Sequence, residues 1–221
     1  MENNYEFEKL NFNEIEMDQI IQNSSDFLDL MKKRRTTRDL SDKPIDKQVL
    51  INIIKTAATA PSGANIQPWT FCLITSEKYK KLIREEAEKI EKLNYEKLFS
   101  DQKKIDIEFT GLDYQKEFLT ESPALIAVFK HKYRIENDKQ IQNYYPNESI
   151  GLALGILLTS IHHAGLATIP YTPTPMTFLK KILDRPSYES PVIILPVAFP
   201  KKEAQIPKIT KKDFDEICVE Y

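Results

Sequence analysis

The amino-acid sequence predicts one domain of the α/β or α+β class, in which helices alternate with the strands of a small sheet. Three observations support this fold class. Helical and strand patterns follow one another along the 221 residues without an internal repeat or a low-complexity segment. A chain of this length buries a core large enough for one domain. One long, almost wholly apolar helix pattern in the second half indicates a helix at the centre of the fold.

Two helices are predicted before the first strand. Residues 1–24 form an N-terminal extension, and a helix is expected from Ser25 to a basic cluster that begins at Lys32. A firmer helix follows Pro44 and ends before Pro61, because its apolar residues recur at the spacing of one helix face. These residues are Val49, Leu50, Ile53, Ile54, Ala57 and Ala58.

The first strand is predicted at residues 69–75, a short apolar run rich in β-branched and aromatic side chains. Ser76 is expected to cap the next helix, which runs on towards Leu98. Residues 99–115 have weaker periodicity and contain Gly111, so that they are expected to be partly irregular and mobile. The apolar stripe of the helix comprises Tyr79, Leu82, Ile83, Ala87 and Ile90.

The second half contains the most apolar helix pattern of the chain, from Glu148 to Ala164, with Gly165 as its expected C-terminal stop. Its apolar residues lie nearly all round the helix, which indicates burial on several sides and suggests a partner subunit. A short helix is predicted at residues 176–183. Strands are predicted at residues 123–130, 166–171 and 192–199.

Composition narrows the classes of function. A formal net charge of -2 and a pI near 6.0 give no basic field for nucleic acid or an anionic membrane. The polar, acidic start of the chain is neither a signal peptide nor a membrane anchor, and no apolar stretch approaches the about 20 residues that span a bilayer. Cys72 and Cys218 both lie in apolar contexts and are expected to be buried thiols, so we expect a cytoplasmic location.

Several kinds of catalytic site are missing from the sequence. It contains only 3 histidines, of which His162 and His163 are adjacent and point in different directions on a helix, so no metal site is expected. The 5 glycines form neither a P-loop nor a G-x-G-x-x-G turn, and no G-x-S-x-G elbow occurs. A bound organic cofactor is therefore favoured as the source of the chemistry.

Two segments near the N-terminus carry a resemblance to a known family. Residues 34–38 read R-R-T-T-R, and residues 59–71 contain A-P-S-G followed by Q-P-W-T-F. In this order and spacing they resemble the signature of the FMN-binding nitroreductase family. Closely spaced arginines suit a phosphate dianion. The alternative for the arginines alone is a solvated helix end that complements the helix dipole, but the second segment favours cofactor binding.

A third set of residues, Glu91, Tyr95 and Lys116, resembles the active-site lid of iodotyrosine deiodinases, so residues 91–118 are predicted to form such a lid. Positions 91 and 95 share one helix face. In that family a carboxylate, a phenol and a lysine grip the ammonium and carboxylate groups of a halotyrosine. The alternative is that these are ordinary surface residues of a highly charged helix. Downstream matches extend the resemblance over residues 25–219.

The resemblance implies the α+β (α/β/α) nitroreductase fold, with a small mixed sheet flanked by helices, as one domain over residues 1–221. It also implies a domain-swapped homodimer with FMN at the interface. Thr172 matches a residue that approaches flavin N5, where a donor favours one-electron steps, and is the expected catalytic residue. The backbone N–H of Ala64 is expected to hold the substrate phenolate. Cofactor contacts are implied for Arg34, Arg35, Thr36, Thr37, Arg38, Ser62, Gly63, Pro170, Tyr171, Thr172 and Lys211.

Two of these positions depart from the family pattern. Pro170 stands where relatives often carry threonine, and it has no backbone N–H to donate. Lys211 stands where many relatives carry arginine, so that the charge is kept but the bidentate fork is lost.

The implied reaction is the FMN-dependent reductive dehalogenation of a halotyrosine, for example iodotyrosine to tyrosine and iodide, under a closed lid. The reductant would be NAD(P)H or a reductase or flavodoxin-type donor. Two alternatives stay open. One is a general NAD(P)H-dependent nitroreductase or flavin reductase, to which Asn65 gives some weight, and the other is a flavin- or tyrosine-binding protein without turnover.

Overall fold

The computed structural model describes residues 6–108 and 113–221. Residues 1–5 of the acidic N-terminus, and Gly111 in the stretch expected to be irregular, lie outside the described residues. Contacts divide the chain into two units, Met1–Arg34 and Arg35–Tyr221, which are described separately.

The first unit contains one helix, α1 (Met17–Lys32), which begins at Met17 and not at Ser25 as the sequence predicted. Side-chain amides explain the earlier start, because the Gln19 amide donates to Asn23 Oδ1 over 2.7 Å and so bridges adjacent turns. None of the residues of α1 is buried.

The second unit is built on a sheet of four strands in the order β1-β2-β6-β5. The strands are β1 (Trp69–Ile74), β2 (Ala124–His131), β5 (Ala167–Thr168) and β6 (Glu189–Ala198). Each neighbouring pair is antiparallel, with a bulge in β2 between Val128 and Phe129. The parallel element of the expected mixed sheet is one isolated bridge between Thr36 and Thr168.

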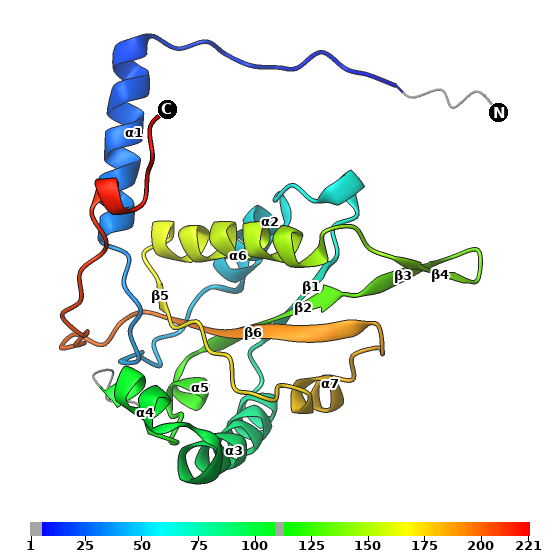
Figure 1. The fold of residues 1–221 in the computed structure, drawn as a ribbon, viewed down its shortest axis with the longest axis vertical. Coiled ribbons are helices and arrows are strands. Elements are labelled where there is room, and N and C mark those ends of the chain that lie inside the picture. Colours follow the sequence, from blue (N-terminus) through cyan, green and yellow to red (C-terminus); the bar gives the residue numbers. More distant parts are fainter. Residues whose placement is uncertain (1–5, 109–112) are drawn as a thin grey trace. The chain divides into compact units, whose positions relative to one another are not determined.

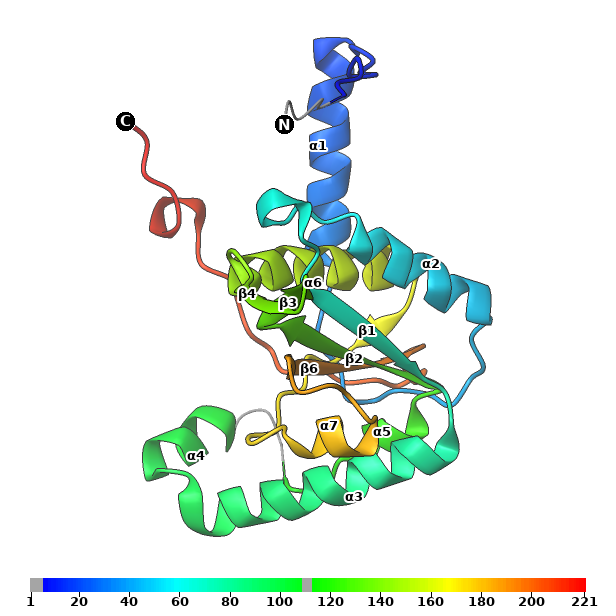
Figure 2. The ribbon, with the colours of Figure 1, turned by 90° about the vertical axis from the view of Figure 1, so that its right-hand side faces the viewer.

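Helices cover both faces of this sheet (Figures 1 and 2). One face carries α2 (Lys47–Ala58) and α6 (Pro146–His163), and the other carries α3 (Glu77–Leu93), α5 (Phe118–Glu121) and α7 (Phe178–Ile182).

Alternation along β2 supplies both cores. Ile126 and Val128 pack in the core with α2 and α6, whereas Leu125, Ala127 and Phe129 pack in the core with α3 and α7. The fully buried strand read from the sequence is thus confirmed, and its two faces separate two hydrophobic clusters.

The helix after β1 differs from its predicted pattern. Ser76 is its N-cap residue, but the serine side chain makes no capping hydrogen bond. Tyr79 and Leu82, assigned to the apolar stripe, are 41% and 38% exposed. The buried face of α3 instead consists of Lys80, Ile83, Ala87 and Glu91.

The long helix α6 is capped as the sequence predicted. Gly165 has φ +77°, and its N–H donates to the His162 carbonyl over 3.0 Å. Within this chain α6 buries one face only, and Leu152 on another face is 51% exposed.

Several features were not predicted, among them the short helix α5. A hairpin joins β3 (Tyr133–Glu136) to β4 (Lys139–Gln142) through Asn137 and Asp138, which both have positive φ. The helix α4 (Asp101–Glu108) lies in the stretch expected to be partly irregular. Cys218 is exposed, so only Cys72 is partly shielded from solvent, and both thiols are free.

Three short elements complete the fold: η1 (Gly63–Asn65), the π-helical turn η2 (Asn94–Leu98) and η3 (Phe214–Glu216). Among the described residues, no helix is both long and apolar enough to cross a bilayer.

Candidate functional site

A pocket of about 350 Å³ lies between the segment after α1, the end of α3 and the segment after β5. Such a volume suits a small-molecule ligand. The pocket gathers most of the residues that the sequence predicted on both the cofactor and the substrate side. They are Thr36, Arg38, Glu91, Tyr95, Lys116, Pro170, Tyr171 and Thr172.

Arg38 places a cationic guanidinium in this pocket, and one of its nitrogens lacks a hydrogen bond among the described residues. Its Nε is buried and has no hydrogen-bond partner among the residues that the structure describes. Burial lowers the pKa of Arg38, and Tyr95 and Asp39 oppose that change. A buried donor without a partner is costly, so an anionic or hydrogen-bond-accepting ligand would stabilise this side chain. The neighbouring Thr37 is buried, and its hydroxyl accepts from the N–H of Asp39 over 3.2 Å.

Glu91 and Lys116 are the two buried charges of the pocket, with 8% and 2% of their surfaces exposed. Burial raises the pKa of Glu91, while Lys116 and the Tyr171 hydroxyl act in the opposite sense. Burial lowers the pKa of Lys116, and Glu91 opposes that change. Burial therefore disfavours the charge of each group, while neighbouring groups, among them the other member of the pair, favour it.

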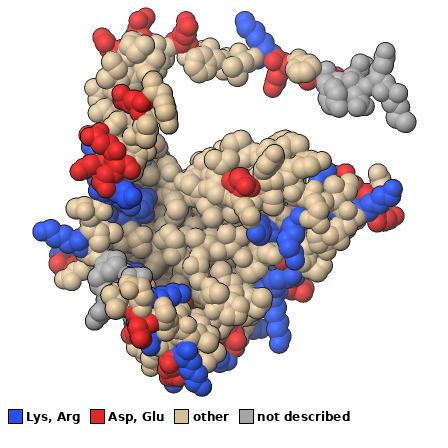
Figure 3. Space-filling model, viewed as in Figure 1, with Lys and Arg blue, Asp and Glu red and all other residues tan. Residues whose placement is uncertain are grey.

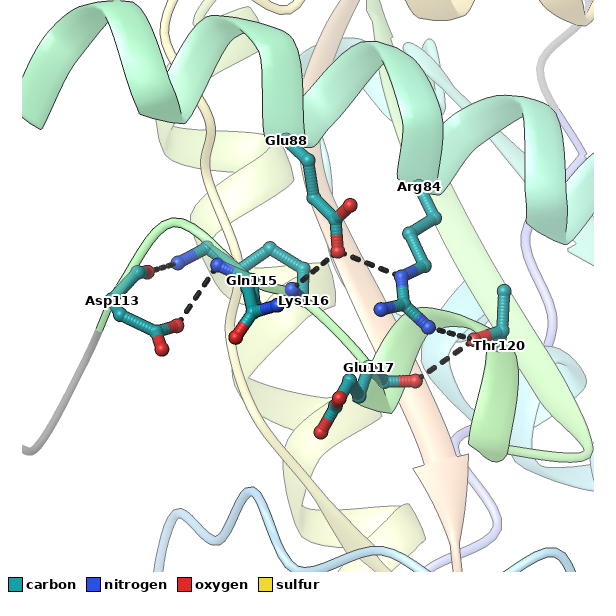
Figure 4. A network of polar contacts seen from close by, with 7 residues as sticks. All are labelled: Arg84, Glu88, Asp113, Gln115, Lys116, Glu117 and Thr120. Atoms are coloured by element: carbon teal, nitrogen blue, oxygen red, sulfur yellow. Dashed lines mark hydrogen bonds and ion pairs between the residues drawn. The ribbon is translucent and has the colours of Figure 1, made fainter.

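Polar contacts hold the backbone and side chain of Lys116 (Figure 4). Its N–H donates to Glu88 Oε1 over 2.7 Å, and Glu88 also pairs with Arg84 at 2.7 Å. The Lys116 ammonium donates to the carbonyl of Asp113 and lies 5.6 Å from the centre of the Tyr95 ring. The α3 helix thus fixes the backbone at Lys116, whose ammonium lines the same pocket as Tyr95 and Glu91.

Tyr95 lies in the π-helical turn that follows α3. Such turns are rare and often mark functional sites. Burial raises the pKa of Tyr95, so its phenol stays protonated and can donate a hydrogen bond. At the start of the same turn, Asn94 donates from Nδ2 to the Thr174 carbonyl over 3.0 Å, which ties the turn to the segment that carries Thr172.

Sequence reasoning missed Phe99, Lys103 and Ile107, which also line the pocket, as does Ile169. The first three extend the series begun by Glu91 and Tyr95 at a constant step of four residues. That spacing was visible in the sequence, but residues 99–115 were expected to be partly irregular. The Tyr95 and Phe99 rings lie 5.2 Å apart, and the Lys103 ammonium lies 3.9 Å from the Phe99 ring centre.

The turn at residues 62–64 does not line this pocket. A Cβ at Gly63 would lie 3.2 Å from the carbonyl oxygen of Tyr144 and from the ring of Tyr145, so the turn leaves little room for a side chain there. Ala64 has φ 49°, a conformation that costs free energy for a residue with a side chain. The Ser62 hydroxyl accepts from the N–H of Gln67 over 2.9 Å. The structure thus places Ser62, Gly63 and Ala64 on a tightly constrained turn outside the pocket of this chain.

Three predicted phosphate ligands also lie outside the pocket lining. Arg35 donates from Nη2 to the Pro207 carbonyl over 2.6 Å. Lys211 is exposed. Arg34 belongs to the first unit. The described residues contain no group of three or more histidine, cysteine, aspartate or glutamate side chains arranged to hold a metal ion.

Comparisons with known proteins agree with the signature. The profile of the nitroreductase family matches residues 31–199. An iodotyrosine deiodinase of Haliscomenobacter hydrossis is 41% identical over 209 residues, which cover 94% of this chain and 94% of that relative. An iodotyrosine deiodinase of Nematostella vectensis is 38% identical over 200 residues, covering 89% of this chain and 75% of that relative.

A solved structure gives the same result. The crystal structure of an oxidised iodotyrosine deiodinase bound to FMN and 3-iodo-L-tyrosine superimposes with a TM-score of 0.76 at 34% identity, covering 88% of this chain and 98% of that one. The chain therefore belongs to the nitroreductase family and, within it, to the family of iodotyrosine deiodinases.

Proposed function

We propose that this protein is an FMN-dependent oxidoreductase that removes the halide from a halotyrosine, converting iodotyrosine to tyrosine and iodide. The observation that carries the proposal is the pocket in which Glu91, Tyr95 and Lys116 lie beside Arg38 and Thr172. A carboxylate, a phenol and an ammonium in one pocket complement the zwitterionic end of an amino acid. A simple aromatic or nitroaromatic substrate would offer a charged partner to neither of these two buried charges.

The residues present fit FMN as the cofactor. Arg38 has a buried Nε that lacks a partner among the described residues, and Thr36, Pro170 and Thr172 form the adjoining wall. We propose that Thr36, Thr37, Arg38 and Thr172 hold the flavin, with Arg35 and Lys211 at its phosphate, while the cofactor contact implied for Arg34 stays a prediction of the sequence. When bound and reduced, FMN would supply the two electrons that the reaction needs.

The chain's own groups bind and orient the substrate. Replacement of carbon–iodine by carbon–hydrogen takes two electrons and one proton and releases iodide. Glu91 accepts from the substrate ammonium, Lys116 donates to its carboxylate, and the Tyr95 phenol adds a hydrogen bond. The hydroxyl of Thr172, exposed at the pocket wall, is the donor on the flavin side. No side-chain nucleophile is required.

We also propose that residues 91–118 act as a lid, of which residues 109–112 lie outside the described residues. Asn94 and Lys116 tie the two ends of this segment to the loop at Thr174 and to α3. Closure over the substrate would exclude water and strengthen each of the charged contacts.

A second copy of the chain would complete the site. Ser62, Gly63 and Ala64 do not line the pocket of their own chain, and apolar residues of α6 remain exposed. We propose a homodimer in which this turn serves the pocket of the partner. The reductant, NAD(P)H or a reductase or flavodoxin-type donor, and the cytoplasmic location stay predictions of the sequence.

Titration of the FMN-loaded protein with iodotyrosine and, separately, with iodophenol tests the proposal through quenching of flavin fluorescence. Strong quenching by iodotyrosine alone is expected, because only iodotyrosine carries the ammonium and carboxylate groups. Anaerobic reduction followed by iodotyrosine should then release iodide and tyrosine. Equal responses to both ligands, with turnover of nitroaromatics, would instead indicate a general nitroreductase.

A further inference from the structure

The hydroxyl of Tyr171 contacts the carboxylate of the substrate pocket. Tyr171 donates from Oη to Glu91 Oε1 over 3.4 Å, and the two residues are 7% and 8% exposed. The backbone of Tyr171 bridges Ile194 of β6 through hydrogen bonds of 3.0 and 2.9 Å. The phenol is therefore anchored in the sheet, whereas Glu91 stands at the end of α3.

The ring of Tyr171 also supports the other side of the pocket. Phe118, the first residue of α5, meets this ring edge to face with the centroids 5.4 Å apart at 83°. Lys116 lies two residues before Phe118 in the chain. One side chain from the sheet thus contacts both Glu91 and the segment that carries Lys116.

This arrangement gives the ring and the hydroxyl separate roles. The ring fills space against Phe118, which a phenylalanine would do equally well. The hydroxyl is buried and would be unsatisfied without Glu91, because the described residues give it no other hydrogen-bond partner. The hydroxyl therefore restricts the orientation of the Glu91 carboxylate.

We propose that Tyr171 is a positioning residue for substrate recognition, whose hydroxyl holds the Glu91 carboxylate in the orientation that accepts the ammonium group of an amino-acid substrate. The sequence placed Tyr171 on the flavin side, and the proposal assigns its side chain to the substrate side. It rests on the proposed function and deepens it, because it names what allows the pocket to select a zwitterion over a simple halophenol.

The charges around Glu91 fix the sign of the expected pH effect. The hydrogen bond from Tyr171 favours the ionised form of Glu91, and its loss would raise the pKa of Glu91 further above the ordinary value. Ammonium binding needs the carboxylate, so the acid limb of iodotyrosine binding would move to higher pH. The titratable groups that act on Glu91 or share its pocket are Lys116, Lys103, Tyr95, Tyr171 and Arg38.

The test uses FMN-loaded protein with Tyr171→Phe and the matched control Tyr133→Phe, whose hydroxyl lies 3.4 Å from Ser187 Oγ outside the pocket. We expect Tyr171→Phe to weaken iodotyrosine binding by roughly tenfold, as befits one hydrogen bond to a charged group. Iodophenol binding and FMN content should stay at the parent's values. The acid limb of iodotyrosine binding should shift upward, and Tyr133→Phe should change none of these quantities.

A second variant separates positioning from packing. In a Glu91→Gln background, Tyr171→Phe should add little further loss, because the hydroxyl acts through Glu91. If Tyr171→Phe binds both ligands like the parent with an unchanged acid limb, or if it loses FMN, the inference is wrong while the proposed function stands. If the parent itself binds iodotyrosine and iodophenol alike, the proposed function fails and this inference fails with it.

Discussion

Glu91 and Lys116 are charged side chains held almost completely out of solvent, and each lies in the pocket with the other. Burial acts against both charges, and their mutual attraction offsets only part of that cost. A ligand with one ammonium and one carboxylate supplies a partner to each. Such a ligand would add a charged partner to each group, beyond the Asp113 carbonyl that Lys116 contacts and the Tyr171 hydroxyl that Glu91 contacts.

Removal of either charge should therefore weaken the binding of a halotyrosine. We expect Glu91→Gln and Lys116→Gln each to raise the dissociation constant for iodotyrosine by roughly ten- to a hundredfold, the worth of a charged hydrogen bond. FMN content, read from the flavin absorbance, should not change. Glu85→Gln on the exposed face of the same helix is the matched control. Unchanged iodotyrosine binding in both pocket variants would refute the assignment of this pair.

Iodotyrosine affinity should fall at both low and high pH, and the pH range of tight binding should be narrower than an ordinary glutamate and lysine would give. The carboxylate of Glu91 must be ionised, and its pKa is raised by burial, so affinity falls as pH drops through a value above that of an ordinary glutamate. The ammonium of Lys116 must be protonated, and its pKa is lowered, so affinity falls as pH rises through a value below that of an ordinary lysine. Dissociation constants measured by fluorescence quenching across pH should show both limbs. If iodophenol binding showed the same two limbs, Glu91 and Lys116 could not cause them by binding the ammonium and carboxylate groups of iodotyrosine.

At the level of single residues, the resemblance singled out residues that lie close together in the structure, and their role in binding substrate stays a prediction. Glu91, Tyr95 and Lys116 lie in one pocket although 21 positions of the chain separate Tyr95 from Lys116 (116 − 95). Burial could not be predicted in the same way. Nothing in a run rich in glutamate and lysine distinguishes Glu91 from its exposed neighbours, because Tyr171, which contacts the carboxylate, comes from a distant part of the chain.

The same limit applies to the element that carries Glu91. Lys80 was not part of the predicted stripe of α3, yet it is 1% exposed. Its ammonium donates to the carbonyls of Thr120 and Ser122 over 3.2 and 2.8 Å and pairs with Glu77 at 2.7 Å. A period of apolar residues cannot reveal a lysine whose partners are backbone carbonyls of the α5 region. Through this side chain α3 is nonetheless joined to the α5 segment that leads into β2.

Lys80→Met should therefore destabilise the fold although methionine fills a similar volume. The carbonyls of the part-buried Thr120 and the buried Ser122 would lose this donor, at a cost of about 1–3 kcal/mol for a buried group left unsatisfied. Lys81→Met, the same change at the next and exposed position, should alter the free energy of unfolding by less than about 0.5 kcal/mol. Denaturant unfolding followed by circular dichroism measures both. Equal stabilities of the two variants would show that the buried contacts of Lys80 contribute nothing.

The sequence predicted the succession along the chain of the sheet strands and of most of the helices that cover them, since these elements repeat apolar residues at regular periods. It missed α4 and the β3–β4 hairpin, which have little apolar periodicity of their own. The hairpin did carry a local signal, because Asn137 and Asp138 are residues that tolerate the positive φ of a tight turn. The π-helical turn at Tyr95 had no comparable signal. A turn that contains one extra residue requires no particular residue type, so the sequence does not reveal it.

On the scale of the whole molecule, the chain leaves much apolar surface uncovered. Leu152 on α6 is 51% exposed, and in the view of Figure 3 charged side chains lie mainly around the rim of the Arg35–Tyr221 unit. The C-terminal segment is also rich in exposed apolar side chains, among them Phe214 at 62% and Ile217 at 69%. Large apolar side chains exposed in this way are common where a protein contacts a partner. A second copy is the partner that would also bring Ser62–Ala64 to a pocket.

Disruption of that interface should therefore affect both assembly and cofactor. We expect the parent to sediment as a dimer and Leu152→Glu to shift it towards monomer, because the new carboxylate would be buried without a partner. FMN should be lost in step with the dimer, since each pocket would lack the turn at residues 62–64. Tyr79→Glu, also an exposed apolar residue but on α3 across the sheet from α6, should remain a dimer with bound FMN. A Leu152→Glu monomer that retains its full FMN would show that one chain builds the whole cofactor site.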